Sequence, residues 1–428
     1  MKQITFYLRN LTIKWQVLSL FVLPLGCTLS AQQFVNKSEI DWVKVADFGG
    51  GAICGGSTFT INDYAYVCVG NGGGYTPSYK RTCYRYDPKM DVWKRLADLP
   101  TTANFRQEGV GFSIIGKGYI TGGMYEGLAS FSYPIDTWEY DPIKNLWYQR
   151  SNFPRIGGIW KGTAFSIDSL GYVGLGIAGF VDSYHEPGEK NDFYQFNPKT
   201  NKWTQLNDFP GAPRSGAVGF SMNGKGYVGL GYRYDLGSGF NFYTDFWEYD
   251  PITDEWTRLP DFPGEGRTNA IGFGLDGECY LGLGQINDFY KYNLETKTWE
   301  SLNYLPCGVR EFTNSFLVNN GIYYGGGSYS YSPYSDFWLY QLKDPTNIPN
   351  LIVRQSHRIF PNPVDDYLHI NELDELAEVK IIDLHGRVVL QSTISNSLGV
   401  FVGCLAKGIY LVKVKNSKEE FDEKLVKK

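Results

Sequence analysis

A tryptophan recurs along this chain at nearly even intervals, and five times it closes the same short phrase. The phrase begins with an aromatic residue and ends with the tryptophan seven positions later: YDPKMDVW, YDPIKNLW, FNPKTNKW, YDPITDEW and YNLETKTW. Its tryptophans are Trp93, Trp147, Trp203, Trp256 and Trp299. Repetition every ~40–55 residues in a chain of short aromatic and β-branched runs predicts the blades of a β-propeller.

One repeat contains four strand-like runs. In the fourth repeat these are SGAVGFSM, YVGLGY, TDFWEYDP and EWTRLPDFP, and turn-forming residues or a longer loop separate them. This pattern predicts one four-stranded antiparallel blade. The first strand is expected to line the central channel. The tryptophan begins the outermost strand, where we expect it to pack between blades as a large apolar anchor.

The two ends of the repeat region complement each other. After Trp299 the chain supplies three strand-like runs, TNSFLVNN, GIYYGGG and SDFWLYQL, but no fourth run with its tryptophan. Near the N-terminus, DWVKVADF has the tryptophan of a fourth strand, Trp42, with no preceding three. We therefore predict an all-β, six-bladed propeller over residues 40–343 in which the N-terminal strand closes the last blade.

The repeats resemble kelch repeats from about Asp41 to Lys343. The resemblance rests on the spaced tryptophan, on paired glycines such as Gly122-Gly123 and Gly325-Gly326, and on a tyrosine in each second strand. Three repeats depart from the pattern, with Gly-Leu-Gly in place of adjacent glycines. Some kelch propellers are copper radical oxidases, whose site needs two histidines. The propeller region here has only His185, which is interpreted as a solvated loop residue.

The repeat pattern ends at Lys343, and the sequence after it differs in composition and periodicity. Residues 344–356 read as a linker, and the alternating runs in residues 357–428 predict a small Ig-like β-sandwich. This region resembles the type A sorting domain of the type IX secretion system, which implies export across an outer membrane and a secretion machinery as partner. The matching residues are Pro361, Asn362, Pro363, Asp383, Gly386, Arg387, Gly408 and Tyr410.

Residues 1–31 have the pattern of a secretory signal peptide. Lys2, Arg9 and Lys14 precede an apolar run, and small residues near Ala31 offer a cleavage point. Lipidation of Cys27 is the alternative reading of this segment. Together with the C-terminal resemblance, the leader predicts a protein that is secreted or held at the cell surface, by way of the periplasm.

Charge and cysteine content limit the remaining classes. A net charge of -5 without a basic patch argues against nucleic acid as a partner. The cysteines are scattered rather than in the close pairs that zinc sites require. We expect no metal and no cofactor. One disulfide in the first repeat and buried free thiols are both open. We expect a monomer.

Four arginines occupy one equivalent position. Each lies six residues before a first-strand phenylalanine: Arg106, Arg214, Arg267 and Arg310. The interpretation weighed here is a partial positive ring at one mouth of the channel, suited to a carboxylate or sulfate. The alternative is structural pairing with neighbouring acids such as Glu108 or Glu311. The Tyr-rich and Ser-rich loops 125–133, 232–243 and 329–334 are a second candidate surface.

Two functions remain in play. The first is an exported binding module that engages an extracellular or surface protein, or a glycan, through the loop face of the propeller. The second is a mutarotase that acts without cofactor on an anionic sugar, because the repeats are similar to those of kelch-type sialic acid mutarotases. No catalytic residue is identified, although Glu108 and Glu311 are candidates for proton transfer.

Overall fold

The structure is a computed structural model, and it is all-β in the part that it describes. That part comprises residues 42–73, 78–127, 131–179, 188–330, 332–341, 359–360, 364–370, 376–383, 386–394, 400–417 and 420–428. The leader, His185 and the Pro361 to Pro363 segment lie outside it. Among the described residues no helix is long and apolar enough to cross a membrane.

Six antiparallel sheets make up the described propeller: five are four-stranded, and the sixth has four strands and one additional short strand. Blade 1 consists of β2 (Ser57–Ile61), β3 (Tyr64–Cys68), β4 (Cys83–Asp87) and β5 (Val92–Arg95). Blade 2 consists of β6 (Val110–Ile114), β7 (Lys117–Thr121), β10 (Thr137–Asp141) and β11 (Leu146–Arg150). Blade 3 consists of β12 (Thr163–Ile167), β13 (Leu170–Gly174), β16 (Phe193–Asn197) and β17 (Lys202–Gln205). Blade 4 consists of β18 (Val218–Met222), β19 (Lys225–Gly229), β22 (Phe246–Asp250) and β23 (Glu255–Leu259).

The remaining two blades complete the circle. Blade 5 consists of β24 (Ile271–Leu275), β25 (Glu278–Gly282), β26 (Phe289–Asn293) and β27 (Thr298–Ser301). Blade 6 consists of β28 (Glu311–Val318), β29 (Gly321–Tyr329), β31 (Phe337–Gln341) and β1 (Trp42–Val45), with β30 (Ser332–Pro333) beside β29. Short hairpins follow three of the second strands: β8 (Tyr125–Glu126) with β9 (Phe131–Ser132), β14 (Ile177–Ala178) with β15 (Gly188–Glu189), and β20 (Tyr232–Asp235) with β21 (Gly239–Phe242).

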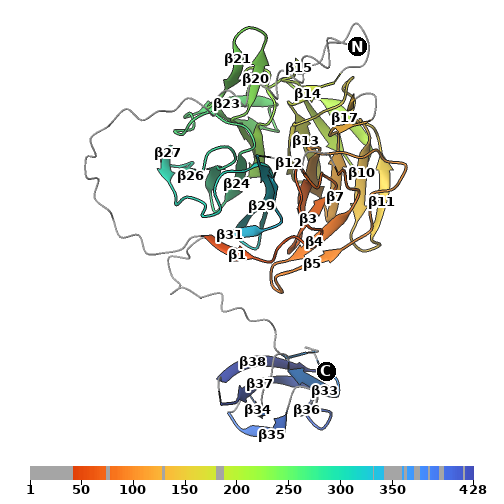
Figure 1. Cartoon of the computed structure of the whole chain (residues 1–428), viewed down its shortest axis with the longest axis vertical. Coiled ribbons are helices and arrows are strands. Elements are labelled where there is room, and N and C mark those ends of the chain that lie inside the picture. Colours follow the sequence, from red (N-terminus) through yellow and green to blue (C-terminus); the bar gives the residue numbers. More distant parts are fainter. Residues whose placement is uncertain are drawn as a thin grey trace, which may run out of the picture. The chain divides into compact units, whose positions relative to one another are not determined.

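The N-terminal strand closes the last blade, as the sequence predicted. Strand β1 pairs antiparallel with β31, and the register places Trp42 opposite Tyr340 and Val45 opposite Phe337. The two strands lie side by side in Figure 1 although almost 300 residues separate them in the sequence. Because β1 covers the outer edge of β31, blade 6 has the same four-stranded form as the others.

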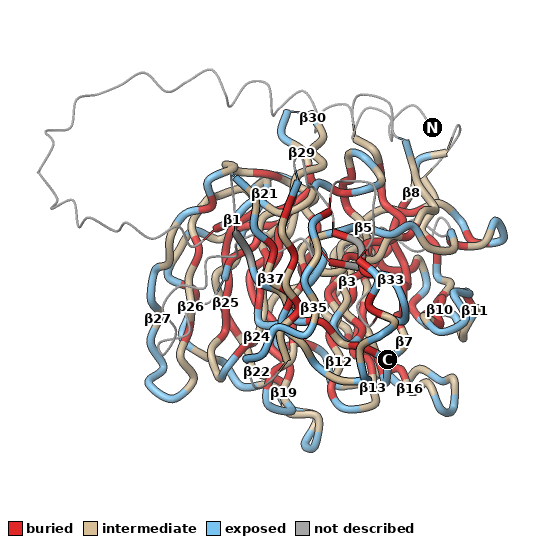
Figure 2. Tube along the Cα trace, turned by 90° about the horizontal axis from the view of Figure 1, so that it is seen from below, coloured by how far each residue is buried: buried red, intermediate tan, exposed pale blue. Residues whose placement is uncertain are grey.

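The core lies between the blades. First strands such as β2 and β6 alternate buried and half-buried residues, and second strands such as β3 are buried almost throughout. In five blades the first-strand phenylalanine stacks on the second-strand tyrosine, as Phe59 does on Tyr66 with ring centroids 5.1 Å apart. Figure 2 shows burial along the inner strands and exposure on outer strands such as β27.

The equivalent tryptophan of each blade contacts the preceding blade. The Trp93 ring lies 5.1 Å from that of Phe337 in blade 6, and its indole N–H donates to the Ala46 carbonyl at 3.1 Å. Trp147 and Trp203 donate in the same way to the carbonyls of Ala97 and Ser151. The other three contact a third-strand phenylalanine of the preceding blade, in the pairs Trp42–Phe289, Trp256–Phe193 and Trp299–Phe246.

The C-terminal unit consists of two sheets around one core. One sheet has β32 (Ile359–Phe360), β33 (Tyr367–Ile370) and β36 (Val400–Phe401). The other has β35 (Val388–Ile394), β34 (Ala377–Ile382), β37 (Gly408–Lys415) and β38 (Glu420–Lys427). Their buried residues form a single apolar cluster that includes Val379, Ile381 and Val412. This is the small β-sandwich that the alternating pattern predicted.

Two details concern the sorting motif and the cysteines. The Arg387 guanidinium and backbone N–H both donate to the Asp383 carboxylate, and Gly386 between them has φ +79°. In blade 1 a disulfide joins Cys68 to Cys83 on adjacent strands, while Cys54 and Cys279 are buried thiols. The propeller therefore contains both a disulfide in the first repeat and buried free thiols.

Closure by β1 predicts a large loss of stability on truncation of Trp42. The Trp42 side chain is 2% exposed and packs against Phe289 and Tyr340. Trp42→Ala should therefore lower the free energy of unfolding by roughly 3–5 kcal/mol, the usual cost of removing a buried tryptophan. Urea unfolding of the purified propeller measures this. Val43→Ala, on the exposed side of the same strand, is the matched control, and equal midpoints for the two variants would contradict closure by β1.

Candidate functional site

A cavity of about 610 Å³ occupies the central channel. The first strands of the six blades line it, and their lumen-facing side chains are small or carry hydroxyl groups, such as Thr58, Ser113, Ser166, Ser221 and Ser315. Large side chains cannot fit where six strands converge. The channel wall therefore offers little chemistry of its own, and the larger polar groups stand at its ends: Asp168 in the β12–β13 turn at one end, and Glu108, Lys161 and Asn269 at the other mouth.

Six equivalent residues form that mouth. Each lies four positions before the first-strand phenylalanine of its blade and lines the cavity: Gly55, Glu108, Lys161, Gly216, Asn269 and Phe312. We call this set the mouth ring. All six have φ between +53° and +62°, a left-handed conformation that favours glycine.

Backbone hydrogen bonds between blades explain the shared conformation. The N–H of Gly55 donates to the carbonyl of Phe312 at 2.7 Å, and the N–H of Glu108 donates to Gly55 at 2.7 Å. The series continues from Lys161 to Glu108 at 3.2 Å and from Gly216 to Lys161 at 2.8 Å. At these four positions the left-handed geometry turns the N–H toward the preceding blade. A residue other than glycine pays on the order of 1 kcal/mol for it.

Glu108 and Lys161 form a charged pair at the mouth. The Lys161 ammonium lies 3.6 Å from a Glu108 carboxylate oxygen, and the two side chains are 12% and 10% exposed. The other Glu108 oxygen accepts a hydrogen bond from the Trp160 indole N–H at 2.9 Å. The pair is thus largely withdrawn from water yet lines a cavity that a ligand can enter.

Aromatic rings surround the Lys161 ammonium. The ring centroids of Trp160 and Phe312 each lie 5.1 Å from it, and that of Tyr232 lies 5.7 Å from it. These distances are within the range of cation–π attraction. Phe312 belongs to the blade opposite Lys161, so the two side chains approach each other across the mouth.

The environment shifts the pKa of both charged groups. Burial raises the pKa of Glu108, and the Lys161 ammonium and the Trp160 N–H oppose this only in part. Burial alone would lower the pKa of Lys161, but the negative charge of Glu108, with Tyr232 and Glu311, outweighs it and raises the pKa. Lys161 therefore stays charged at neutral pH. Glu108 takes up a proton at a higher pH than an ordinary carboxyl group.

The four arginines predicted as an anion-binding ring do not line the cavity. Their side chains are at most 3% exposed, and each pairs with an aspartate just before the third strand of its own blade. The pairs are Arg106–Asp136, Arg214–Asp245, Arg267–Asp288 and Arg310–Asp336. The structural alternative fits these contacts, although the partners are not Glu108 or Glu311.

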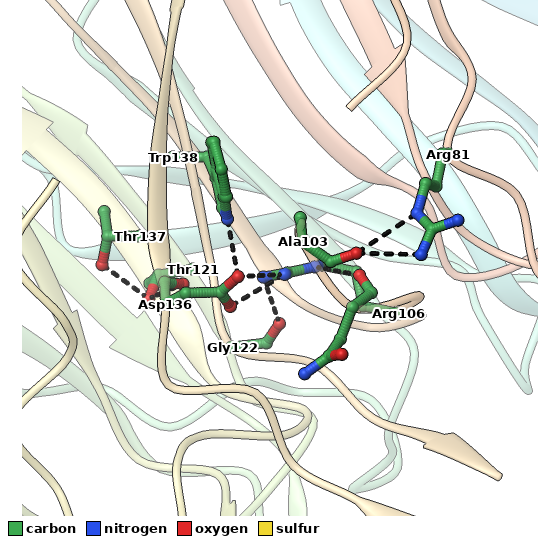
Figure 3. A network of polar contacts seen from close by, with 9 residues as sticks. Arg81, Ala103, Arg106, Thr121, Gly122, Asp136, Thr137 and Trp138 are labelled. Carbon is green, nitrogen blue, oxygen red and sulfur yellow. Dashed lines mark hydrogen bonds and ion pairs between the residues drawn. The ribbon is translucent and has the colours of Figure 1, made fainter. Parts of the chain in front are cut away.

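Arg106 illustrates how these guanidinium groups are bound within the protein. Its Nη2 donates to both Asp136 oxygens at 2.8 Å, and its Nη1 donates to the Gly122 carbonyl at 3.2 Å (Figure 3). The Trp138 indole N–H donates to the same carboxylate. In blade 3, Arg155 takes the equivalent role with Asp192 although it is out of register in the sequence. Burial of these guanidinium groups, rather than exposure at the cavity, keeps them from an external anion.

The other expected site residues lie around the same mouth. Glu311 immediately precedes Phe312 and accepts a hydrogen bond from the Gln285 amide at 2.8 Å. The β8–β9 and β20–β21 hairpins fall within loops 125–133 and 232–243, while β29 and β30 meet in loop 329–334. Among the described residues no cluster of His, Cys, Asp and Glu is placed to hold a metal ion.

Sequence reasoning missed Lys161, Asn269 and Phe312. The alignment on the first-strand phenylalanine that brought the arginines into register also brings these three into register, two positions further on. Their side chains differ from blade to blade, so no repeated letter marked the position. The charged and aromatic side chains of the site thus occupy a position at which the repeats differ in sequence.

Comparison with known proteins gives the C-terminal region a family. Residues 358–428 match the family described as "Secretion system C-terminal sorting domain". This confirms the resemblance seen in the sequence. The protein is directed outside the cell or to its surface and interacts through this domain with a secretion machinery.

The propeller region is similar to kelch proteins. An N-acetylneuraminate epimerase of Yersinia enterocolitica is 32% identical over 140 residues, which span 32% of this chain and 33% of the relative. Kelch-like protein 23 of Pongo abelii is 24% identical over 59% of this chain and 43% of the relative. The solved structure "Structure of YjhT" aligns with a TM-score of 0.56 and 18% identity over 70% of this chain and 98% of its own, which shows the propeller fold. The matched stretches thus cover less than half of these two sequence relatives.

The contacts of the arginines predict that they matter for stability. Arg214→Ala leaves Asp245 buried without its charge partner, so the free energy of unfolding should fall by roughly 3–5 kcal/mol. Urea unfolding measures the change. Arg258→Ala is the control, since its pair with Asp261 is about half exposed, and its unfolding midpoint should not move. An Arg214→Ala protein of native stability would refute the structural role.

Proposed function

We propose that the exported propeller binds a small carboxylated sugar at the mouth ring and exchanges its anomers. The observation that carries this proposal is the Glu108–Lys161 pair, a largely buried acid and base beside aromatic rings at the mouth of the cavity. Carbohydrate sites combine such charged groups with flat apolar surfaces. The relatives named N-acetylneuraminate epimerase support a sugar of this kind.

The chemistry needs only proton transfer. Lys161, charged at neutral pH, attracts the carboxylate on the anomeric carbon. The Glu108 carboxylate takes the proton of the anomeric hydroxyl while the bond from the anomeric carbon to the ring oxygen breaks, and the Lys161 ammonium protonates that oxygen. Rotation in the open-chain keto acid exposes the other face of the carbonyl. Closure reverses both proton transfers, so Glu108 and Lys161 regain their charges.

Export of this activity is part of the proposal. We infer that residues 1–31 are removed, that residues 40–343 act as the binding unit and that residues 357–428 serve transport. In the sorting domain, the Asp383–Arg387 turn and the Gly408 and Tyr410 strand start would be read by the machinery. Because the proposed reaction needs only proton transfer, the exported enzyme would work without a cofactor.

A second candidate function rests on the β20–β21 hairpin. Its tip exposes Leu236, which is 80% exposed, and Phe240 and Phe242 are partly exposed beside it. Exposed apolar side chains on a projecting hairpin suit contact with a protein or glycan. This is the loop-face binding module, and it is compatible with a small-molecule site at the mouth.

Exchange of the anomers of N-acetylneuraminic acid tests the first proposal. The native protein should accelerate the exchange over buffer, as followed by NMR. Glu108→Gln and Lys161→Met should each lower the acceleration on the order of 100-fold or more, since each removes a proton-transfer group. Glu278→Gln and Lys291→Met are matched controls, because that Glu–Lys pair lies in blade 5 away from the mouth. A native protein that gives no acceleration would refute the activity.

The raised pKa of Glu108 predicts the acid limb of the pH profile. Glu108 acts as the carboxylate, so the rate should fall as pH drops through its pKa, at a higher pH than the ~4.3 of an ordinary glutamate. Lys161→Met should move any residual limb to still higher pH, because it removes the opposing positive charge. The pH dependence of the exchange rate measures both. A limb in the ordinary carboxyl range would assign the proton transfer to another group.

A further inference from the structure

The order of the blades arranges the mouth ring into two walls. Residues three blades apart face each other, so Gly55 in blade 1 stands opposite Gly216 in blade 4. Glu108 and Lys161 lie together on one side of the line joining these glycines. Asn269 and Phe312 lie together on the other side. The two glycines therefore leave space at opposite ends of the mouth, while Lys161 and Phe312 meet between them, with the ammonium 5.1 Å from the ring centroid.

Phe312 destabilises the fold at this position relative to glycine, because its backbone is left-handed. Its φ of +57° is unusual for a bulky residue, and glycine meets the same backbone requirement in blades 1 and 4. Its ring belongs to none of the buried apolar clusters among the described residues. The contact recorded for the ring is with the Lys161 ammonium, 5.1 Å away across the mouth. Packing therefore does not explain why a phenylalanine stands here.

Asn269 offers an available amide. The residue is half-buried and lines the cavity, and no hydrogen bond of its side chain is recorded within the described part of the chain. An amide donates two hydrogen bonds and accepts two. It can therefore bind a hydroxyl or acylamino group of a ligand without giving up a contact within the protein.

We propose that Phe312 and Asn269 are the specificity-determining wall of the site. A carboxylated pyranose lies across the mouth and parts the Lys161–Phe312 contact: its carboxylate draws the ammonium toward itself, the C–H face of its ring takes the place of the ammonium on Phe312, and a hydroxyl or acylamino substituent is hydrogen-bonded to Asn269. The inference rests on the proposed function. It adds the orientation of the sugar and the reason why a strained phenylalanine occupies the mouth ring.

Phe312→Gly separates this role from a structural one, because the two properties should change in opposite directions. Removal of the side chain relieves the left-handed strain, so the urea midpoint should rise. The affinity for N-acetylneuraminic acid, measured by isothermal titration, should fall at least 10-fold, with KM raised and kcat little changed. Phe312→Leu keeps the strain and loses the flat ring, so it should lower the affinity without raising the midpoint.

Ile115→Gly is the matched control. Ile115 also has positive φ, at +43°, but it lies 65% exposed in the turn between β6 and β7. Its replacement should raise the midpoint and leave the affinity unchanged. Asn269→Gly removes the amide without adding left-handed strain, so it should weaken the binding of N-acetylneuraminic acid without lowering the urea midpoint.

The outcomes distinguish this inference from the proposed function. If the native protein accelerates anomer exchange and Phe312→Gly retains its affinity, the wall is refuted and the function stands. If Phe312→Gly is less stable than the native protein, the residue serves the fold and the inference is also refuted. If the native protein neither binds N-acetylneuraminic acid nor accelerates its exchange, the proposed function fails, and the assignment of the wall fails with it.

Discussion

Backbone hydrogen bonds that pass from blade to blade around the channel mouth set the geometry on which the site depends. Each recorded link runs from the N–H of one mouth-ring residue to the carbonyl of the preceding one, as from Glu108 to Gly55. Four such links are recorded, and all six equivalent positions have left-handed backbone. This shared backbone conformation fixes where six side chains begin, whatever those side chains are. The repeat determines the backbone conformation at this position but not the side chain, so the side chains can differ between blades to form a site.

Charges serve two separate purposes in the propeller. The arginine–aspartate pairs lie within single blades, with the guanidinium groups almost fully buried and bonded also to backbone carbonyls. Such pairs hold the approach to the first strand against the start of the third. The Glu108–Lys161 pair instead joins two blades and faces the cavity. A ligand can compete for the second kind of pair, whereas the arginines of the first kind are buried and do not line the cavity.

The sequence was sufficient for the architecture and insufficient for the direction of side chains. Trp42 could be assigned to the last blade because the missing fourth strand and the isolated first one completed each other. The arginines were correctly placed in register, but their partners lie 21 to 31 residues away, and a repeat pattern does not show toward which face a side chain turns. Lys161 and Phe312 could not be found from the repeat pattern, because each occurs in only one blade at that position.

The central claim is that a carboxylated sugar is held at the mouth ring rather than by the buried arginines or by the outer hairpins. A crystal structure of the protein with N-acetylneuraminic acid tests it most directly. The account predicts density for the sugar across the mouth between Gly55 and Gly216, with its carboxylate within hydrogen-bond distance, ~3 Å, of the Lys161 ammonium. Density for the sugar on the β20–β21 hairpin, with an empty mouth ring, would contradict it.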